Sequence, residues 1–145
     1  MKLEPIKTSD EALELMEKSA DELNELVATA HGWTEKTVFG EEPAFVDEDG
    51  VIVQLVSEYN PAGNWNFAFE LVRELNDAGY VIAINTHDAA TLERAIIVGG
   101  FPTRDDLKPL PLVRVDVEPE GVYKNEVCRA ICMPVSYTHL RAHET

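Results

Sequence analysis

A helix-forming segment in the middle of the chain, with strand-forming sequence on both sides, most constrains the fold. Residues 60–64 (NPAGN) interrupt the chain, and Asn and Pro are typical of a helix entrance. We expect the helix that follows to end at Ala78-Gly79, with Trp65 and Phe69 as core anchors. Its apolar side chains recur three and four positions apart and so share one face: Trp65, Ala68, Phe69, Val72 and Leu75.

Strand-forming sequence precedes this helix. Residues 37–39 (TVF) and 44–46 (AFV) flank a Gly-Glu-Glu-Pro turn, and a second turn, 47–50 (DEDG), leads into the β-branched run 51–56. Short apolar runs separated by turn residues are typical of antiparallel hairpins. We therefore expect strands between residues 34 and 59.

Strand-forming sequence also follows the helix. Residues 80–85 (YVIAIN) predict a strand, and valines alternate with charged residues over 113–118, which predicts a half-exposed strand. Residues 89–98 fit a helix by the spacing of their apolar residues, or a buried strand over 94–98. We favour the strand, because a sheet meander needs one at this place. A Pro-rich and charged loop is expected over 101–111.

Two capping boxes open the N-terminal part of the chain. Thr8 and Ser19 are each followed by a Glu three positions later, so that each pair can satisfy free backbone N–H groups at a helix start. They predict an N-terminal helical segment, 9–30, made of two short helices at about 9–18 and 20–30 or of one helix kinked near Ser19.

This helical segment has one apolar and one charged face. Gly32 stands where a left-handed cap is expected, with Trp33 able to fold back onto the last turn. The apolar stripe consists of Leu13, Met16, Ala20, Leu23 and Val27. The opposite face carries Glu11, Glu14, Lys18, Asp21 and Glu25.

The end of the chain has an unusual sequence. Residues 135–145 (VSYTHLRAHET) resemble the conceptual translation of a transposase-type sequencing adapter, and Pro134 fits a codon that the adapter completes. We therefore expect residues 1–133 to form a single α+β domain, and residues 134–145 to be an adapter-derived tail of a gene assembled from metagenomic reads, outside the fold. A natural segment that happens to match is the alternative.

The last helix is predicted to begin at residue 123 and to end near Met133. A proline inside a helix costs about 3 kcal/mol, so Pro134 should stop it. The spacing of the apolar residues places Val127, Ala130 and Ile131 on the sheet. Arg129 and Glu126 should then point outward.

Composition limits the partners of the chain. The formal net charge is −15, and it is unchanged without the tail, because residues 134–145 contain one acidic and one basic residue. Such acidity argues against binding nucleic acid, which needs Lys and Arg, and against anionic membranes. No segment approaches the roughly 18 apolar residues of a membrane span, and the first ten residues do not form a signal peptide. Two cysteines are consistent with a reducing cytoplasm.

Three segments, taken in order, resemble the phage ABA sandwich domain family. Residues 59–69 (YNPAGNWNFAF) resemble that family's Tyr/Phe-Asn/Ser-Pro/Ser-x-x-Asp/Asn-Trp helix entrance. Residues 20–33 (ADELNELVATAHGW) are similar to its opening helix, and residues 125–134 (NEVCRAICMP) to its closing helix. The resemblance covers nearly all of the chain from about residue 19 to the tail.

This resemblance implies a single layered α+β domain, with an antiparallel sheet packed with helices in an α/β/α sandwich-like arrangement. It also implies an uncharacterised protein of a tailed bacteriophage or prophage, located in the host cytoplasm. The family has no known activity, so no catalytic residue can be transferred to this chain. Residues 1–18 and 86–108 depart from the family's compact pattern.

Several residues invite a chemical interpretation, and each has a simpler one. Asp47 could begin a calcium loop, but the positions that should carry later ligands are apolar and strand-like, which favours a hairpin turn. Cys128 and Cys132 lie one helical turn apart, yet two thiols alone do not make a zinc site, so we expect small core residues.

The histidines allow a similar comparison. His31 precedes Gly32 and is explained by favourable charge at a helix C-terminus. His87-Asp88 resembles half of a catalytic dyad, but no nucleophile motif accompanies it, and Asp88 suits a helix cap. We therefore expect no catalytic, cofactor-binding or metal-ligating residue, and no cofactor.

Three functions remain open from the sequence. The first is a small, non-enzymatic phage accessory protein that binds a host or phage protein. The second is an acidic inhibitor, in which the charged face of residues 10–25 imitates nucleic acid and occupies a basic host factor; a solvated surface helix is the ordinary explanation of that face. The third is an enzyme without a recognisable motif.

Overall fold

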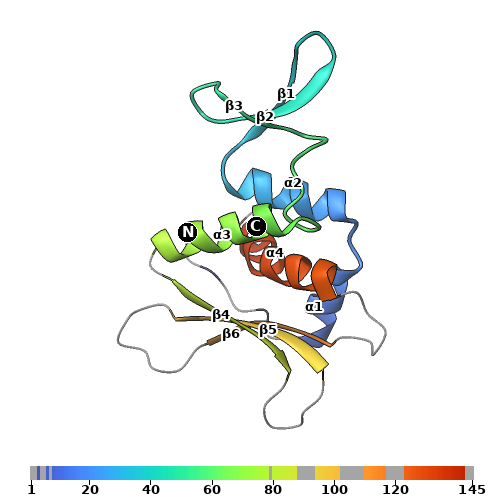
Figure 1. Ribbon diagram of the computed structural model, residues 1–145, viewed down its shortest axis with the longest axis vertical. Coiled ribbons are helices and arrows are strands. Elements are labelled where there is room, and N and C mark those ends of the chain that lie inside the picture. Colours follow the sequence, from blue (N-terminus) through green and yellow to red (C-terminus); the bar gives the residue numbers. More distant parts are fainter. Residues whose placement is uncertain are drawn as a thin grey trace.

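The computed structural model describes residues 3, 6, 8–78, 80–87, 94–101, 110–116 and 123–142. Helices α2, α3 and α4 lie between two three-stranded sheets (Figure 1). The α+β class, with helices packed on an antiparallel sheet, is confirmed. In chain order the elements are α1 (Ser9–Met16), α2 (Ala20–Ala30), β1 (Thr34–Val38), β2 (Glu42–Val46), β3 (Ile52–Leu55), α3 (Trp65–Asp77), β4 (Val81–His87), β5 (Arg94–Phe101), β6 (Leu110–Asp116) and α4 (Tyr123–Ala142).

The first sheet has the strand order β1-β2-β3, and both of its pairs are antiparallel. The turn between β2 and β3 is the predicted 47–50 hairpin turn. The Asp47 carboxylate closes it by accepting the N–H groups of Asp49 and Val51, each at 2.9 Å. Gly50 has a φ of +80°, a conformation that glycine adopts without a steric penalty.

The second sheet has the order β4-β5-β6 and is also antiparallel. The three strands predicted after helix α3 are confirmed, and residues 94–98 form a strand rather than a helix. Residues 89–93 and 102–109 lie outside the described residues. Helix α4 contacts both β5 and β6, so this sheet supports the central helix.

The two N-terminal helices begin where the capping boxes predict. The Thr8 hydroxyl accepts the N–H of Glu11 at 3.2 Å, and the Ser19 hydroxyl accepts the N–H of Glu22 at 3.1 Å. The predicted apolar stripe is wrong at Leu13, which is 57% exposed, whereas Leu15 is buried. A separate cap at Ser19 restarts the helix, so the periodicity of α2 does not extend back through α1.

Helix α3 begins and ends as predicted, but it buries a different face. The Asn64 side chain caps its first turn by accepting the N–H of Asn66 at 2.9 Å. Phe69 is 50% exposed and stacks on the half-buried Trp65, so neither is a core anchor. Apolar residues cover more than one face of this helix, and its neighbours in the fold select which face is buried. The fully buried positions are Ala68, Leu71 and Leu75.

Helix α4 is the central helix of the fold. It contacts α1, α2, α3, β5 and β6, and it lies between α3 and the second sheet in Figure 1. Side chains on every side of it are buried, which distinguishes it from an amphipathic surface helix. The buried residues are Val127, Cys128, Ala130, Ile131, Cys132, Met133, Pro134, Val135, Ser136, Tyr137 and Thr138.

The expected end of this helix near Met133 is wrong, because α4 continues to Ala142. Residues 134–142 therefore belong to the helix and not to a tail outside the fold. Pro134 removes one backbone hydrogen bond, at a cost of about 3 kcal/mol. Burial of Val135 and Tyr137 offsets this cost, since each buried apolar side chain contributes about 1.5–3 kcal/mol. The resemblance of the segment to an adapter translation stays a hypothesis about its origin.

Polar contacts join α4 to α1. The expectation that Arg129 points outward is wrong, because its guanidinium donates to the carbonyl oxygens of Lys18, at 2.7 Å, and Met16. A cation at this place stabilises the free carbonyl groups at the end of a helix. Glu126 is also partly buried rather than outward. The Tyr137 hydroxyl donates to the carboxylate of Glu11, and this bond lowers the pKa of Glu11.

The burial pattern of α3 predicts the effect of two substitutions. Leu71→Ala should lower the free energy of unfolding by about 2–5 kcal/mol, because it leaves a cavity in the core. Phe69→Ala should change it by less than about 1 kcal/mol, since half of that ring already lies in solvent. Urea denaturation of the two variants measures both values. Equal losses would show that α3 is rotated from the orientation described.

Candidate functional site

The exposed side of α2 carries a row of carboxylates. Asp21, Glu22 and Glu25 are all exposed, and we call these three residues the acidic ridge. Acidic residues in a first turn also stabilise the helix dipole, which accounts in part for Asp21 and Glu22. Of the described cations, only Lys18 pairs with the ridge, with its Nζ 4.0 Å from Glu22 Oε2. The negative charge of Asp21 and Glu25 is therefore available to a partner.

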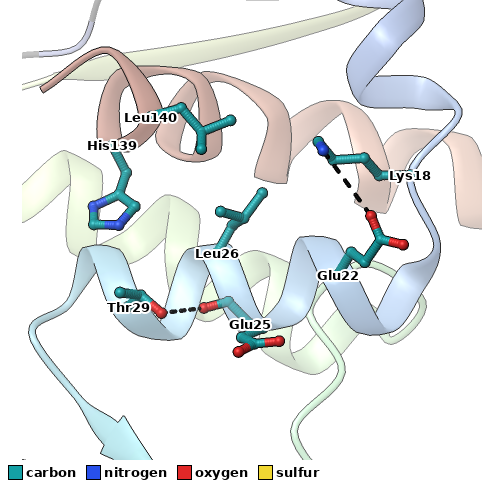
Figure 2. Close-up of a pocket in the computed structure, with 7 residues that line it drawn as sticks. All are labelled: Lys18, Glu22, Glu25, Leu26, Thr29, His139 and Leu140. Atoms are coloured by element: carbon teal, nitrogen blue, oxygen red, sulfur yellow. Dashed lines mark hydrogen bonds and ion pairs between the residues drawn. The ribbon is translucent and has the colours of Figure 1, made fainter. Parts of the chain in front are cut away.

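One hollow flanks the ridge on the side of α4. It has a volume of about 310 Å³ (Figure 2). Leu26, His139 and Leu140 point into the space between α2 and α4, whereas the carboxylate of Glu25 points away from it. Its wall on α4 is formed by residues of the segment that resembles an adapter translation. This hollow is therefore the weaker candidate for a function.

A second, larger groove flanks the ridge on the side of the first sheet. It has a volume of about 440 Å³, within the range of about 300–1,000 Å³ that is usual for ligand sites. Three exposed carboxylates line it, and two buried aromatic side chains form its inner wall. We call it the acidic groove, lined by Ala20, Asp21, Asn24, Glu25, Glu35, Pro43, Phe45, Val56, Ser57, Tyr59 and Asn60.

The strand register places the sheet side of this groove. Glu35 on β1 is directly opposite Phe45 on β2, so both side chains lie on the same face of the sheet. Pro43 lies two residues from Phe45 and shares that face. Glu35 thus adds a carboxylate from the sheet to those of Asp21 and Glu25 on α2. The sequence alone did not single out Glu35 because its position depends on this pairing.

A buried polar contact fixes the loop side of the groove. Asn24 is only 6% exposed, and its amide donates to Asn60 Oδ1 at 3.0 Å. Asn24 Oδ1 accepts the N–H of Ala62 at 2.9 Å. These bonds hold the loop before α3 against α2. The sequence carries a signal for this contact, since Asn24 is a polar residue within the apolar stripe of α2.

An aromatic cluster runs from the groove wall to the end of α2. Phe45 and Tyr59 meet edge to face with ring centroids 5.6 Å apart, and Tyr59 meets Trp33 in the same way at 5.4 Å. Trp33 in turn stacks on His31 at 4.4 Å. Burial raises the pKa of Tyr59, so its hydroxyl stays neutral. The cluster makes the groove wall a rigid apolar surface.

His31 closes α2 and links it to α3. Its Nδ1 lies 2.7 Å from the Val27 carbonyl oxygen, and its Nε2 contacts the Glu74 carboxylate. Both partners only accept hydrogen bonds, so both ring nitrogens donate only when the imidazole is protonated. Burial alone lowers the pKa of His31, but Glu74 and the Val27 carbonyl outweigh it, and the pKa is raised. The predicted role of His31 as a helix cap is confirmed.

The other candidates from the sequence do not form a reactive site. Cys128 and Cys132 are buried in α4, as expected of core residues, and burial raises the pKa of the Cys132 thiol. The side chain of His87 and the whole of Asp88 lie outside the described residues. Within the described part of the chain, no three His, Cys, Asp or Glu side chains are placed to hold a metal ion. Across the same residues, no helix is long and apolar enough to cross a lipid bilayer.

Comparison of the chain with models of known protein families, with curated proteins and with solved structures found no match.

The contacts of His31 predict a dependence of stability on pH. A group whose pKa is raised in the folded state stabilises the fold fully below its unfolded pKa, about 6.5. That contribution is lost as pH rises through the folded pKa. The difference in free energy of unfolding between wild type and Glu74→Gln should therefore be larger at pH 5.5 than at pH 8.5. Urea denaturation at the two values tests this, and a difference that grows toward pH 8.5 would contradict it.

Proposed function

We propose that this protein is a small, non-enzymatic accessory protein that binds a basic partner protein through the acidic ridge and the acidic groove. The observation that carries the proposal is the exposed carboxylates of Asp21, Glu25 and Glu35 around an aromatic wall. Complementary charge steers association and suppresses wrong partners. A net charge of −15 disfavours nucleic acid, anionic lipid and a second copy of the chain.

Two potentially reactive side chains, those of Cys132 and His31, are in states that support a function without catalysis. A cysteine nucleophile acts as a thiolate, and the buried Cys132 has a raised pKa. A histidine base needs a free ring nitrogen, and both nitrogens of His31 are engaged. The resemblance to the phage family supports a bacteriophage origin and a location in the host cytoplasm as parts of the same proposal.

The alternative function is an inhibitor that imitates nucleic acid. Its specific support is the further exposed carboxylates on α1, at Asp10 and Glu14, which add to the negative charge of the ridge. Such an inhibitor would compete with DNA or RNA for its host factor. An accessory protein of the first kind would bind its partner without that competition.

Charge reversal tests the proposed function. Partners captured from a host lysate by the wild-type protein are identified and purified, and their affinity is then measured for two matched variants. Asp21→Lys with Glu25→Lys should weaken binding at least tenfold, because it reverses the charge of the surface that attracts the partner. Asp49→Lys with Asp77→Lys changes the net charge equally at exposed positions that belong neither to the ridge nor to the groove lining, and should bind within about twofold of wild type.

An equal loss of affinity in both variants would contradict a role for the α2 surface, and so would an unchanged affinity in both. Competition by a DNA duplex would select the inhibitor, and its absence would select the accessory protein. Circular dichroism verifies that each variant folds.

A further inference from the structure

We infer that the acidic groove is a docking site for an arginine side chain on a basic, exposed segment of the partner protein. The inference depends on the proposed function and specifies the chemistry of the partner at that site. The groove combines two features in one place: three carboxylates from two elements, and an apolar surface between them.

The carboxylates come from two different elements, α2 and β1. Asp21 and Glu25 lie four residues apart on α2 and so share one helix face. Glu35 lies on β1, on the same face of the sheet as Phe45, and also lines the groove. All three are exposed, and no ion pair joins any of them to a described cation. A cation bound in the groove would meet negative charge from α2 and from β1.

The lining between the carboxylates favours a side chain with a long apolar stem. Ala20, Pro43 and Val56 line the groove, together with the buried rings of Phe45 and Tyr59. Arginine lays its methylene stem on apolar surface while its charged head stays at the rim. Its planar guanidinium stacks on aromatic rings and donates to two carboxylates at once, whereas a lysine ammonium is a point charge.

The charge around the groove favours a protein segment over a small cation. Further exposed carboxylates lie outside the groove, at Glu22 on α2 and at Asp10 and Glu14 on α1. A partner with several cations can also use these carboxylates, whereas a small amine can use only the groove. A second copy of the chain would bring another net charge of −15 to the same place and be repelled.

The groove is also pre-formed. Asn24 holds the loop at residues 60–62 through two hydrogen bonds, and the aromatic cluster fixes the position of Tyr59. A rigid site loses little conformational freedom on binding, which leaves more of the interaction energy for affinity. The bound arginine would therefore meet walls that are already in place.

Binding of a labelled peptide tests the inference. The probe is the peptide Thr-Arg-Thr-Arg-Thr-Arg-Thr-amide with fluorescein on its N-terminal amine, and the readout is fluorescence anisotropy with the full chain. Replacement of Glu25 and Glu35 by Gln should weaken binding at least tenfold, because both walls of the groove lose charge. The matched variant Asp49→Asn with Asp77→Asn has the same net charge and should bind within about twofold of wild type. The lysine version of the peptide should bind several-fold more weakly than the arginine version.

Amide chemical shifts on peptide addition should change at Asp21, Glu25, Glu35 and Phe45. Equal weakening in the two variants, equal affinity for the lysine peptide, shifts confined to Leu26 and His139, or no binding would each overturn the inference. Displacement of the peptide by an equal concentration of spermidine would also overturn it, in favour of a small polyamine. Binding of the natural partner can depend on Asp21 and Glu25 while the peptide does not bind at the groove. That result would support the proposed function and contradict the arginine site.

Discussion

The burial of α4 on all sides is the constraint on which the rest of the fold depends. The helix contacts three other helices and two strands of the second sheet, so it is the common neighbour of elements far apart in the sequence. Its buried surface outweighs the hydrogen bond that Pro134 removes. The buried Ser136 is satisfied within the helix, since its hydroxyl donates to the Cys132 carbonyl oxygen at 2.9 Å. Arg129 ties the same helix to the end of α1.

The position of α2 follows from this arrangement and determines the candidate site. Leu23 and Val27 are fully buried and face the core, which leaves the acidic ridge to solvent on the opposite side. Two contacts then orient α2 relative to its neighbours, one through Asn24 to the loop before α3 and one through His31 to Glu74. The acidic groove lies next to the first of these contacts. Its chemistry thus depends on core packing as well as on surface charge.

Local signals predicted the helix starts, because a cap at Thr8, Ser19 or Asn64 acts within one turn of chain. Burial was harder to predict. Apolar residues on more than one face of α3 left the choice between Phe69 and Leu71 to tertiary contacts. The acidic groove could not be predicted either, since Glu35 joins Asp21 and Glu25 only through strand register and helix docking. The end of α4 could not be predicted locally, because Pro134 favours a helix that stops at Met133 and only tertiary burial of residues 135–138 carries the helix past it.

The most direct test of the central position of α4 is thermal melting of chain 1–145 beside chain 1–133. The account predicts that chain 1–145 melts at a clearly higher temperature, because chain 1–133 loses the buried side chains of Val135, Tyr137 and Thr138 and the bond from Tyr137 to Glu11. Amide hydrogen exchange on chain 1–145 should also show slow exchange in residues 135–138. Identical melting of the two chains, with fast exchange in those residues, would show that α4 ends before them and that the fold is centred elsewhere.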